Sequence, residues 1–318
     1  MRPMTPAILP RLDLIPRGQI TPAAIQAFYA YLQTTPATVA TYKTGIRNFL
    51  SWLKSQPPAE ALQPSRQTLI AYRAYLIQAY RPATVNLYIT ALHCLFSWLS
   101  LEGLYSNIAD HVKGIKTTRG HKRDSLTAPA VREILDGITP GGIIPARDYA
   151  IIALMATTGI RSIEVLRANV EDLRLFQGIP VLYIQGKGRT EKSDFVKITQ
   201  PVFAAIREYI KRRGTTPGAA PLFASEGHFC RGQRLSRRSL SRLIKQHFRT
   251  AGYDLKTLTA HSLRHTAATL ALLNGESVEE VQQLLRHTDI NTTMIYNHSI
   301  NRITSNAENS ITGAIFGR

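Results

Sequence analysis

Two short segments of this chain place charged and titratable side chains where a simple packing pattern would not require them. In TTGIRSIEV, Arg161 follows a glycine that ends an apolar run, and Glu164 lies on the same helical face. In AHSLRHTAATL, residues His261, Arg264 and His265 have the spacing that groups them on one side of a helix start. A histidine and an arginine at a helix N-terminus form a good phosphate or oxyanion site, although Arg161 and Glu164 alone are also consistent with a structural ion pair.

Three further candidates lie in separate settings. Lys187 stands between two glycines in IQGKGRTEK, at the expected tip of a hairpin, where the full phosphate-binding loop pattern is absent. The segment SVEEVQQLLRHT predicts a helix with a capping box from Ser277 to Glu280 that delivers His287 at its end. Tyr296 follows in HTDINTTMIYNH. Taken singly, the lysine is consistent with a solvated turn and the tyrosine with the edge of a core.

Together these residue types favour phosphoryl transfer to a tyrosine. Two guanidinium groups can bind the non-bridging oxygens of one phosphate, and such cations stabilise the developing charge. A tyrosine hydroxyl, whose ordinary pKa is about 10, needs a nearby cation or base to attack at neutral pH. Lys187 has the chemistry of a general acid for the leaving oxygen. A zinc site is disfavoured because Ser262 stands where the zincin pattern has glutamate, so we expect no metal and no cofactor.

The charge of the chain points to a polyanionic partner. Lys and Arg number 39 against 21 Asp and Glu, a net charge of +18. Such a surplus is most typical of nucleic-acid binding, with an anionic membrane surface as the other candidate. We expect no segment to span a bilayer, no secretory signal in the proline-interrupted N-terminus, and, with two cysteines, a reducing cytoplasm.

Basic residues concentrate in two segments. Residues 116–124, KTTRGHKRD, are polar and basic and are interpreted as an interdomain linker, equally consistent with a solvated loop. Residues 231–249 combine many cations with apolar residues at helical spacing, which predicts a helix with a phosphate-contacting face. The candidate DNA contacts are Lys116, Arg119, Lys122, Arg123, Arg231, Arg234, Arg237, Arg238, Arg242 and Lys245.

The elements that must position these residues fall into two groups. After an irregular arm over 1–18, residues 19–115 predict a helical domain with an internal echo. TPATVATYKTGIRNFLSWL (35–53) and RPATVNLYITALHCLFSWL (81–99) align without gaps and predict two similar amphipathic helices, with Thr38 and Thr84 as N-caps. A further helix is expected between them.

The second domain is expected over 125–318. It begins with a capped helix and a buried helix that ends at Gly159, followed by a β-hairpin within 180–199. The fold class is therefore mainly α with a small β-sheet, α+β. Four later helices are expected at about 201–213, 236–250, 261–273 and 277–287.

The order and spacing of these motifs resemble the tyrosine recombinase (phage integrase, Xer-like) family over nearly the whole chain. The matching strings are TGIRSIEV, GKG, HSLRH and LLRHTDINTTMIY. One departure is Arg286, which stands where the family usually has glycine. The resemblance implies a catalytic set, with Glu164 and His265 in support, that consists of Arg161, Lys187, His261, Arg264, His287 and the nucleophile Tyr296.

The resemblance also implies a fold and a reaction. A SAM-like core-binding bundle and a catalytic domain would form a C-shaped clamp around double-stranded DNA. Tyr296 would attack the scissile phosphate to give a 3′-phosphotyrosyl bond, and strand exchange would pass through a Holliday junction without metal or ATP. The partners implied are an inverted-repeat core site, three further copies of the chain in a homotetramer and, compatibly, accessory DNA-bending proteins, all in the cytoplasm of a bacterium or archaeon.

Two expectations concern the C-terminal region. The tail, about 299–318, ends in the apolar ITGAIF and is expected to dock on a neighbouring subunit. The small polar residues between His287 and Tyr296 suggest a mobile connection.

Two competing functions keep the same residues. They are DNA relaxation of the type IB topoisomerase kind and non-catalytic DNA binding on this scaffold. The helical echo and the apolar tail favour a recombinase, and the complete catalytic set argues against a pure binder. The biological role would be dimer resolution, or integration and excision of a mobile element.

Overall fold

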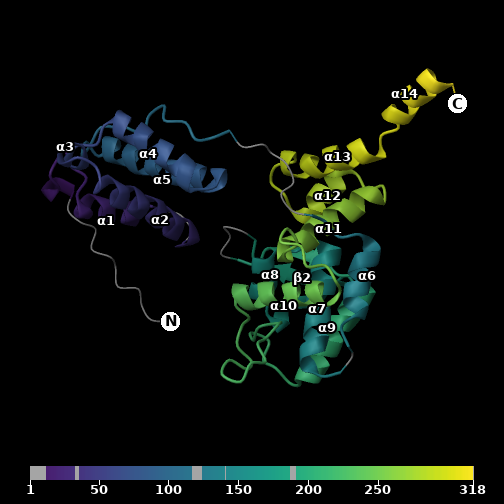
Figure 1. The fold of residues 1–318 in the computed structure, drawn as a ribbon. Coiled ribbons are helices and arrows are strands. Elements are labelled where there is room, and N and C mark those ends of the chain that lie inside the picture. The colour runs from purple at the N-terminus through teal and green to yellow at the C-terminus, as the bar shows by residue number, and fades with distance from the viewer. Residues whose placement is uncertain (1–11, 33–35, 117–123, 140, 187–190, 318) are drawn as a thin grey trace. The chain divides into compact units, whose positions relative to one another are not determined.

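The structure is a computed structural model that describes residues 12–32, 36–116, 124–139, 141–186 and 191–317. It divides into two compact units, residues 1–118 and 119–318, which are described separately (Figure 1). The described elements are mostly helices, with one three-stranded sheet. The predicted fold class, mainly α with a small sheet, is confirmed.

The N-terminal unit is a helical bundle around one apolar core. Its core residues come from every long helix, including Phe28, Phe49, Leu69 and Phe96. Its elements are the 3₁₀ turn η1 (Leu12–Leu14) and the helices α1 (Pro22–Tyr31), α2 (Pro36–Leu53), α3 (Pro58–Leu62), α4 (Arg66–Ala79) and α5 (Pro82–Leu101).

The two echoed segments form α2 and α5, which pack against each other. They approach closely at Gly45 and Ala91, which are equivalent positions of the echo. A Cβ on Gly45 would lie 3.1 Å from Tyr88 Cδ1 and 3.3 Å from Ala91 Cβ. The repeated sequence therefore supplies two small residues at its own contact point, and this allows the helix backbones to come close together.

The expected threonine caps of these helices are wrong. Helix α5 begins at Pro82 after the N-cap residue Arg81, and α2 is helical from Pro36. Thr38 and Thr84 therefore lie inside the first turn. Proline is favoured at the first helical position because its missing N–H would have no partner there and its φ is already helical.

Helix α5 also corrects the expectation that no segment could span a bilayer. By length and composition alone it is long and apolar enough to do so. Its apolar residues nevertheless form the middle of the bundle, where Leu92, Leu95 and Phe96 are fully buried. The apolar run is explained by its place in a protein core.

The C-terminal unit contains many short elements around a main core, and a second, small apolar cluster lies among α11, α12 and α13. Its helices begin and end close to the predicted limits, and three helices, α8, α13 and α14, were not predicted as separate elements. The elements are α6 (Ala128–Asp136), α7 (Ile143–Thr158), α8 (Ser162–Arg167), η2 (Val170–Asp172), β1 (Leu173–Phe176), β2 (Ile179–Ile184), β3 (Asp194–Lys197), α9 (Gln200–Arg213), α10 (Arg237–Thr250), α11 (Ala260–Leu273), α12 (Val278–Leu285), α13 (Asn291–Thr304) and α14 (Ala307–Phe316).

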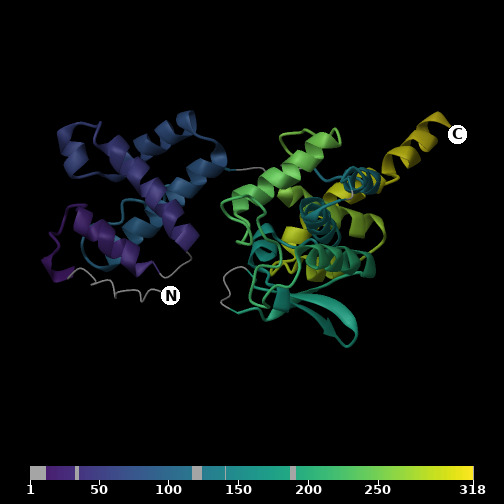
Figure 2. The ribbon, with the colours of Figure 1, turned by 90° about the horizontal axis from the view of Figure 1, so that it is seen from below.

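The sheet is antiparallel in the order β1-β2-β3. Strands β2 and β3 form the predicted hairpin, in a register that pairs Leu182 with Val196. Strand β1 was not predicted, because it is only four residues long. Its turn to β2 is tight, since Gln177 and Gly178 both have positive φ, as a two-residue hairpin requires. Figure 2 shows these strands at the edge of the catalytic unit.

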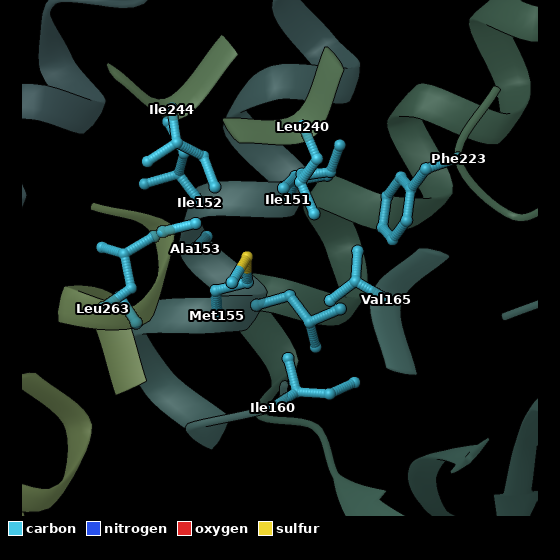
Figure 3. Packing of buried hydrophobic residues seen from close by; sticks show 14 of the residues in the cluster. Ile151, Ile152, Ala153, Met155, Ile160, Val165, Phe223, Leu240, Ile244 and Leu263 are labelled. Atoms are coloured by element: carbon cyan, nitrogen blue, oxygen red, sulfur yellow. The ribbon is translucent and has the colours of Figure 1, made fainter. Parts of the chain in front are cut away.

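Helix α7 is the centre of this unit. It packs against α9 on one side and α11 on another. Ile151, Ile152 and Met155 of α7 lie among residues of α8, α10 and α11, including Leu240 and Leu263 (Figure 3). Most residues of α7 are buried, so the helix is packed on several sides and its C-terminal end positions the residues that follow it.

Candidate active site

The site begins where α7 ends. Gly159 has φ +59°, and a Cβ there would lie 2.5 Å from Leu285 Cδ2, so glycine is required for both conformation and space. The Gly159 carbonyl accepts a hydrogen bond from Arg264 Nη1, and the Leu285 carbonyl accepts one from Arg264 Nη2. Arg264 is only 2% exposed. Its guanidinium therefore joins the C-terminal ends of α7 and α12, where the helix carbonyls carry partial negative charge.

Arg161 and Glu164 form the next layer of the site. Arg161 is the N-cap residue of α8, and Glu164 lies in the first turn. Glu164 Oε2 accepts from the Arg161 backbone N–H and Oε1 accepts from Arg161 Nη1, both at 2.8 Å. Glu164 is fully buried, whereas the side chain of Arg161 is 27% exposed. The buried carboxylate thus holds one edge of the guanidinium, while part of the Arg161 side chain stays exposed.

A third guanidinium belongs to the same cluster. Arg286 Nη2 donates to Glu164 Oε2 at 3.0 Å and Nη1 donates to the Leu284 carbonyl at 2.8 Å. The Arg286 carbonyl in turn accepts from Arg161 Nη2 at 3.2 Å. Sequence reasoning noted Arg286 only as a departure from a usual glycine and gave it no role in the site. No local sequence pattern predicts that Arg286 contacts Glu164, because the two residues are far apart in the chain.

His287 lies beside this cluster as a neutral ring. Its Nδ1 is 2.9 Å from the Oγ1 of Thr293, which is fully buried. Burial, followed by the charges of Arg264, Arg161 and Arg286, lowers the pKa of His287 to about 4. At neutral pH the ring therefore carries a single N–H, and it can donate that hydrogen to a phosphate oxygen without titrating.

Tyr296 is positioned by α13 and packs on an apolar cluster that includes Leu285 and Val281. Only 5% of Tyr296 is exposed, and its hydroxyl oxygen lies 2.5 Å from His265 Nδ1. Burial raises the pKa of Tyr296, and the charge of Arg264 opposes that shift. The hydroxyl is accordingly protonated at neutral pH, and the geometry suits its donation to His265.

The histidine pair stands on the first turns of α11. The rings of His261 and His265 are 4.6 Å apart in an edge-to-face arrangement. Thr259 is the N-cap residue, and its hydroxyl accepts from the His261 backbone N–H at 3.3 Å. His261 is exposed, so it lies on the open side of the site. The predicted grouping of His261, Arg264 and His265 at one helix start is present in the structure.

Between His287 and Tyr296 the structure has a turn and the start of a helix, and the expected mobility of this connection stays a prediction. Helix α13 begins at Asn291, and Asp289 Oδ1 accepts from the Asn291 backbone N–H at 2.9 Å. Thr293 packs inward against His287. The small polar residues therefore serve as a helix cap and a buried hydrogen-bond partner, roles that composition alone does not distinguish from a loose loop.

The electrostatic balance of the site suits an anion. Three guanidinium groups, of Arg161, Arg264 and Arg286, face one carboxylate, that of Glu164. Burial and the two neighbouring arginines lower the pKa of Arg264 to about 9, which leaves it charged at neutral pH. The surplus positive charge is arranged before any ligand arrives, as stabilisation of a phosphoryl-transfer transition state requires. In the described part of the chain, no group of three or more His, Cys, Asp or Glu side chains could hold a metal ion.

The candidate DNA contacts separate into two kinds. Arg237, Arg238 and Arg242 on α10 are exposed, as is Lys116. The Arg231 side chain is 78% exposed and lies 3.5 Å from Glu226. Exposure is the property that phosphate contacts need, and the assignment of these residues to DNA stays a prediction. Four predicted site residues, Lys187, Arg119, Lys122 and Arg123, lie outside the described residues.

Two predicted contacts are held by the protein itself. Arg234 Nη1 donates to the carbonyls of Leu166 at 2.6 Å and Ala168 at 3.0 Å, and Nη2 donates to Asn169 Oδ1 at 2.6 Å. Lys245 Nζ donates to the Leu255 carbonyl at 2.7 Å. The structure thus gives both cations a structural role in fixing loops next to α10, a role that a basic sequence run cannot reveal.

Comparison with known proteins identifies the class. The family model for the phage integrase family matches residues 124–302, and that for the phage integrase N-terminal SAM-like domain matches residues 25–103. The chain is 28% identical over 274 residues to "Tyrosine recombinase slr0733" of Synechocystis sp., a match covering 82% of this chain and 86% of that protein. It is 31% identical over 276 residues to "Tyrosine recombinase XerD" of Bifidobacterium longum, with coverage of 82% and 86%.

A solved structure shares the fold. The XerH site-specific recombinase bound to palindromic difH substrate, in a post-cleavage complex, superposes with a TM-score of 0.72 at 21% identity, covering 89% of this chain and 83% of that one. This chain belongs to the phage integrase family, the tyrosine recombinases. It is an enzyme of site-specific recombination that cleaves and rejoins DNA, and the two competing functions are not favoured.

Proposed function

We propose that Tyr296 is the nucleophile of this recombinase and that the arginine cluster holds the scissile phosphate. The single observation that carries the proposal is the contact of the Tyr296 hydroxyl with His265, next to Arg264 and the surplus of guanidinium groups. The contact supports the proposal because it gives the hydroxyl a proton acceptor, His265, which stands on the same helix start as Arg264.

The proposed reaction uses these residues as follows. The Tyr296 oxygen attacks phosphorus while its proton passes to His265, and the bond from phosphorus to the 5′-oxygen breaks. Lys187 protonates that oxygen, with His261 assisting proton transfer, which leaves a 3′-phosphotyrosyl ester and a 5′-hydroxyl. Arg161 and Arg264 neutralise the non-bridging oxygens, and neutral His287 donates one hydrogen bond to them. No metal or other cofactor enters this scheme.

Strand exchange requires more than one copy of the chain. The 5′-hydroxyl of a partner duplex attacks the phosphotyrosyl bond, and repetition on the second strand pair passes through a Holliday junction. We propose a homotetramer on two inverted-repeat sites of double-stranded DNA, with accessory DNA-bending proteins as additional partners, in the cytoplasm. Residues 19–115 and 125–318, joined by 116–124, would close on the DNA as a clamp.

Helix α14 supports an assembly of this kind. It buries no residue in this chain, and Ile311, Ile315 and Phe316 are 58%, 67% and 74% exposed. Exposed apolar residues at helical spacing are costly unless covered. We propose that α14 docks on a neighbouring copy in the tetramer. Dimer resolution and movement of a mobile element are both compatible with this assembly.

The proposal is tested by trapping the covalent intermediate. A DNA site selected from random inverted repeats by binding to the full chain, hereafter the selected site, is prepared with a nick beside the cleavage point. Cleavage then releases the short fragment between the cleavage point and the nick, which carries the 5′-hydroxyl. Because this fragment diffuses away, religation cannot occur, and wild-type protein should accumulate a covalent adduct. Tyr296→Phe should form none. Tyr253→Phe is the matched control, because its hydroxyl donates to Glu133 at 2.7 Å elsewhere in the domain and its loss should leave adduct formation intact. An adduct with Tyr296→Phe would overturn the assignment.

A further inference from the structure

Arg286 has a backbone conformation that its residue type rarely adopts. It ends α12 with φ 54° and ψ 49°, in the left-handed region that glycine enters freely and residues with a Cβ disfavour. Its side chain is also largely buried, at 12% exposed. A strained backbone and a buried charge both oppose folding, so the contacts of this guanidinium must offset them.

Arg286 is linked to Arg161 in two ways, through the carboxylate of Glu164 and through its own backbone carbonyl. Arg286 Nη2 donates to Glu164 Oε2 at 3.0 Å, while Arg161 Nη1 donates to the other oxygen, Oε1, at 2.8 Å. The Arg286 carbonyl accepts from Arg161 Nη2 at 3.2 Å. Arg161 is thus held on two nitrogens, once by a carboxylate that Arg286 fixes and once by the Arg286 backbone itself.

We propose that Arg286 is a positioning residue for Arg161. Because Arg286 pairs with Glu164 as well, the carboxylate neutralises Arg161 only in part, and the remaining positive charge of Arg161 acts on the scissile phosphate. Each carboxylate oxygen receives one guanidinium: Oε1 binds that of Arg161, and Oε2 is shared between the Arg161 backbone N–H and Arg286 Nη2. The added cation also raises the positive potential at the phosphate, where negative charge grows during attack. This inference rests on the proposed function, because it requires a phosphate at Arg161.

Two substitutions separate the side chain from the backbone. Arg286→Gly fits φ 54°, keeps the carbonyl that binds Arg161 and removes the side chain with its guanidinium. Arg286→Lys keeps a charge near Glu164 but retains the strain. On the nicked selected site, Arg286→Gly should lower the single-turnover cleavage rate at least about tenfold, the effect typical of a partner that acts through a contacting residue. Its Kd for DNA should stay within about twofold, because surface phosphate contacts supply most of that affinity. Arg286→Lys should recover part of the rate.

A neutral substrate distinguishes an electrostatic role from a purely structural one. A methylphosphonate at the scissile position removes one non-bridging oxygen and its charge. The loss caused by Arg286→Gly should shrink on this substrate, since less charge develops for Arg161 to stabilise. An equal loss on both substrates, a loss confined to Kd, or cleavage at the wild-type rate would each overturn the inference. Absence of any Tyr296-dependent adduct in the wild-type protein would instead overturn the proposed function, so the two failures are distinguishable.

Discussion

Replacing Glu164 by glutamine removes the one carboxylate that the arginine cluster shares. Glu164 is fully buried and accepts three hydrogen bonds, from Arg161 N and Nη1 at 2.8 Å and from Arg286 Nη2 at 3.0 Å. Glutamine has the same shape but only one acceptor oxygen, so at least one donor would face an NH₂ group. Removing one partner of a buried ion pair costs about 3–5 kcal/mol. We expect a loss of this order in the free energy of unfolding of the catalytic domain.

The positions of the tryptophans provide an internal control for the measurement. Both tryptophans, Trp52 and Trp98, lie in α2 and α5, so their fluorescence follows unfolding of the N-terminal bundle. Far-UV circular dichroism follows both units. With a urea m-value of about 2 kcal/mol/M, the catalytic-domain midpoint of Glu164→Gln should fall by roughly 1.5–2.5 M. The fluorescence midpoint should not change.

A double variant tests the reason for the loss. Removing the guanidinium of Arg286 from the Glu164→Gln protein deletes one of the charges left without a partner. Glu164→Gln combined with Arg286→Gly should therefore be more stable than additivity of the two single changes predicts. A catalytic-domain stability of Glu164→Gln within about 0.5 kcal/mol of wild type, the range of ordinary surface changes, would refute the shared-carboxylate reasoning.

Three other predictions concern single features of the site and surface. His287→Trp should keep cleavage activity and an unchanged rate profile from about pH 6 to 8, because the pKa of His287 is about 4 and the ring stays neutral there; a shifted profile would contradict this. Arg238→Gln should lower the slope of log affinity against log salt by about 1, whereas Arg234→Gln, whose guanidinium binds protein oxygens, should mainly lower thermal stability; equal slopes for both would be the adverse result. Deletion of residues 306–318 should abolish cooperative DNA binding and synapsis, and unchanged cooperativity would exclude the docking of α14.

Much of the site could be predicted because its residues lie in recognisable local patterns. His261, Arg264 and His265 share one helix start, and a helix start is readable from periodicity and the capping sequence. Gly159 was predicted to end a buried helix, and it does. Such groupings depend on local spacing alone, so they can be predicted without knowledge of tertiary contacts.

The features of the site that the sequence did not predict depend on contacts between segments far apart in the chain. Arg286 meets Glu164, and Arg234 meets Leu166, only after the chain has folded, and no periodic pattern encodes either contact. Strand β1 was missed because it has only four residues, too few to show a clear pattern. The apolar length of α5 was underestimated because polar residues interrupt it, although its core face is continuous.

The central claim is that Tyr296 forms the covalent bond to DNA. It is tested most directly by mapping the DNA-linked residue in the trapped protein. Trypsin should release the modified segment HTDINTTMIYNHSINR, which follows Arg286 and contains a single tyrosine. Fragmentation of this peptide should place the phosphate-linked nucleotide on Tyr296. A nucleotide found on any serine or threonine of the segment, or on another peptide, would contradict the account.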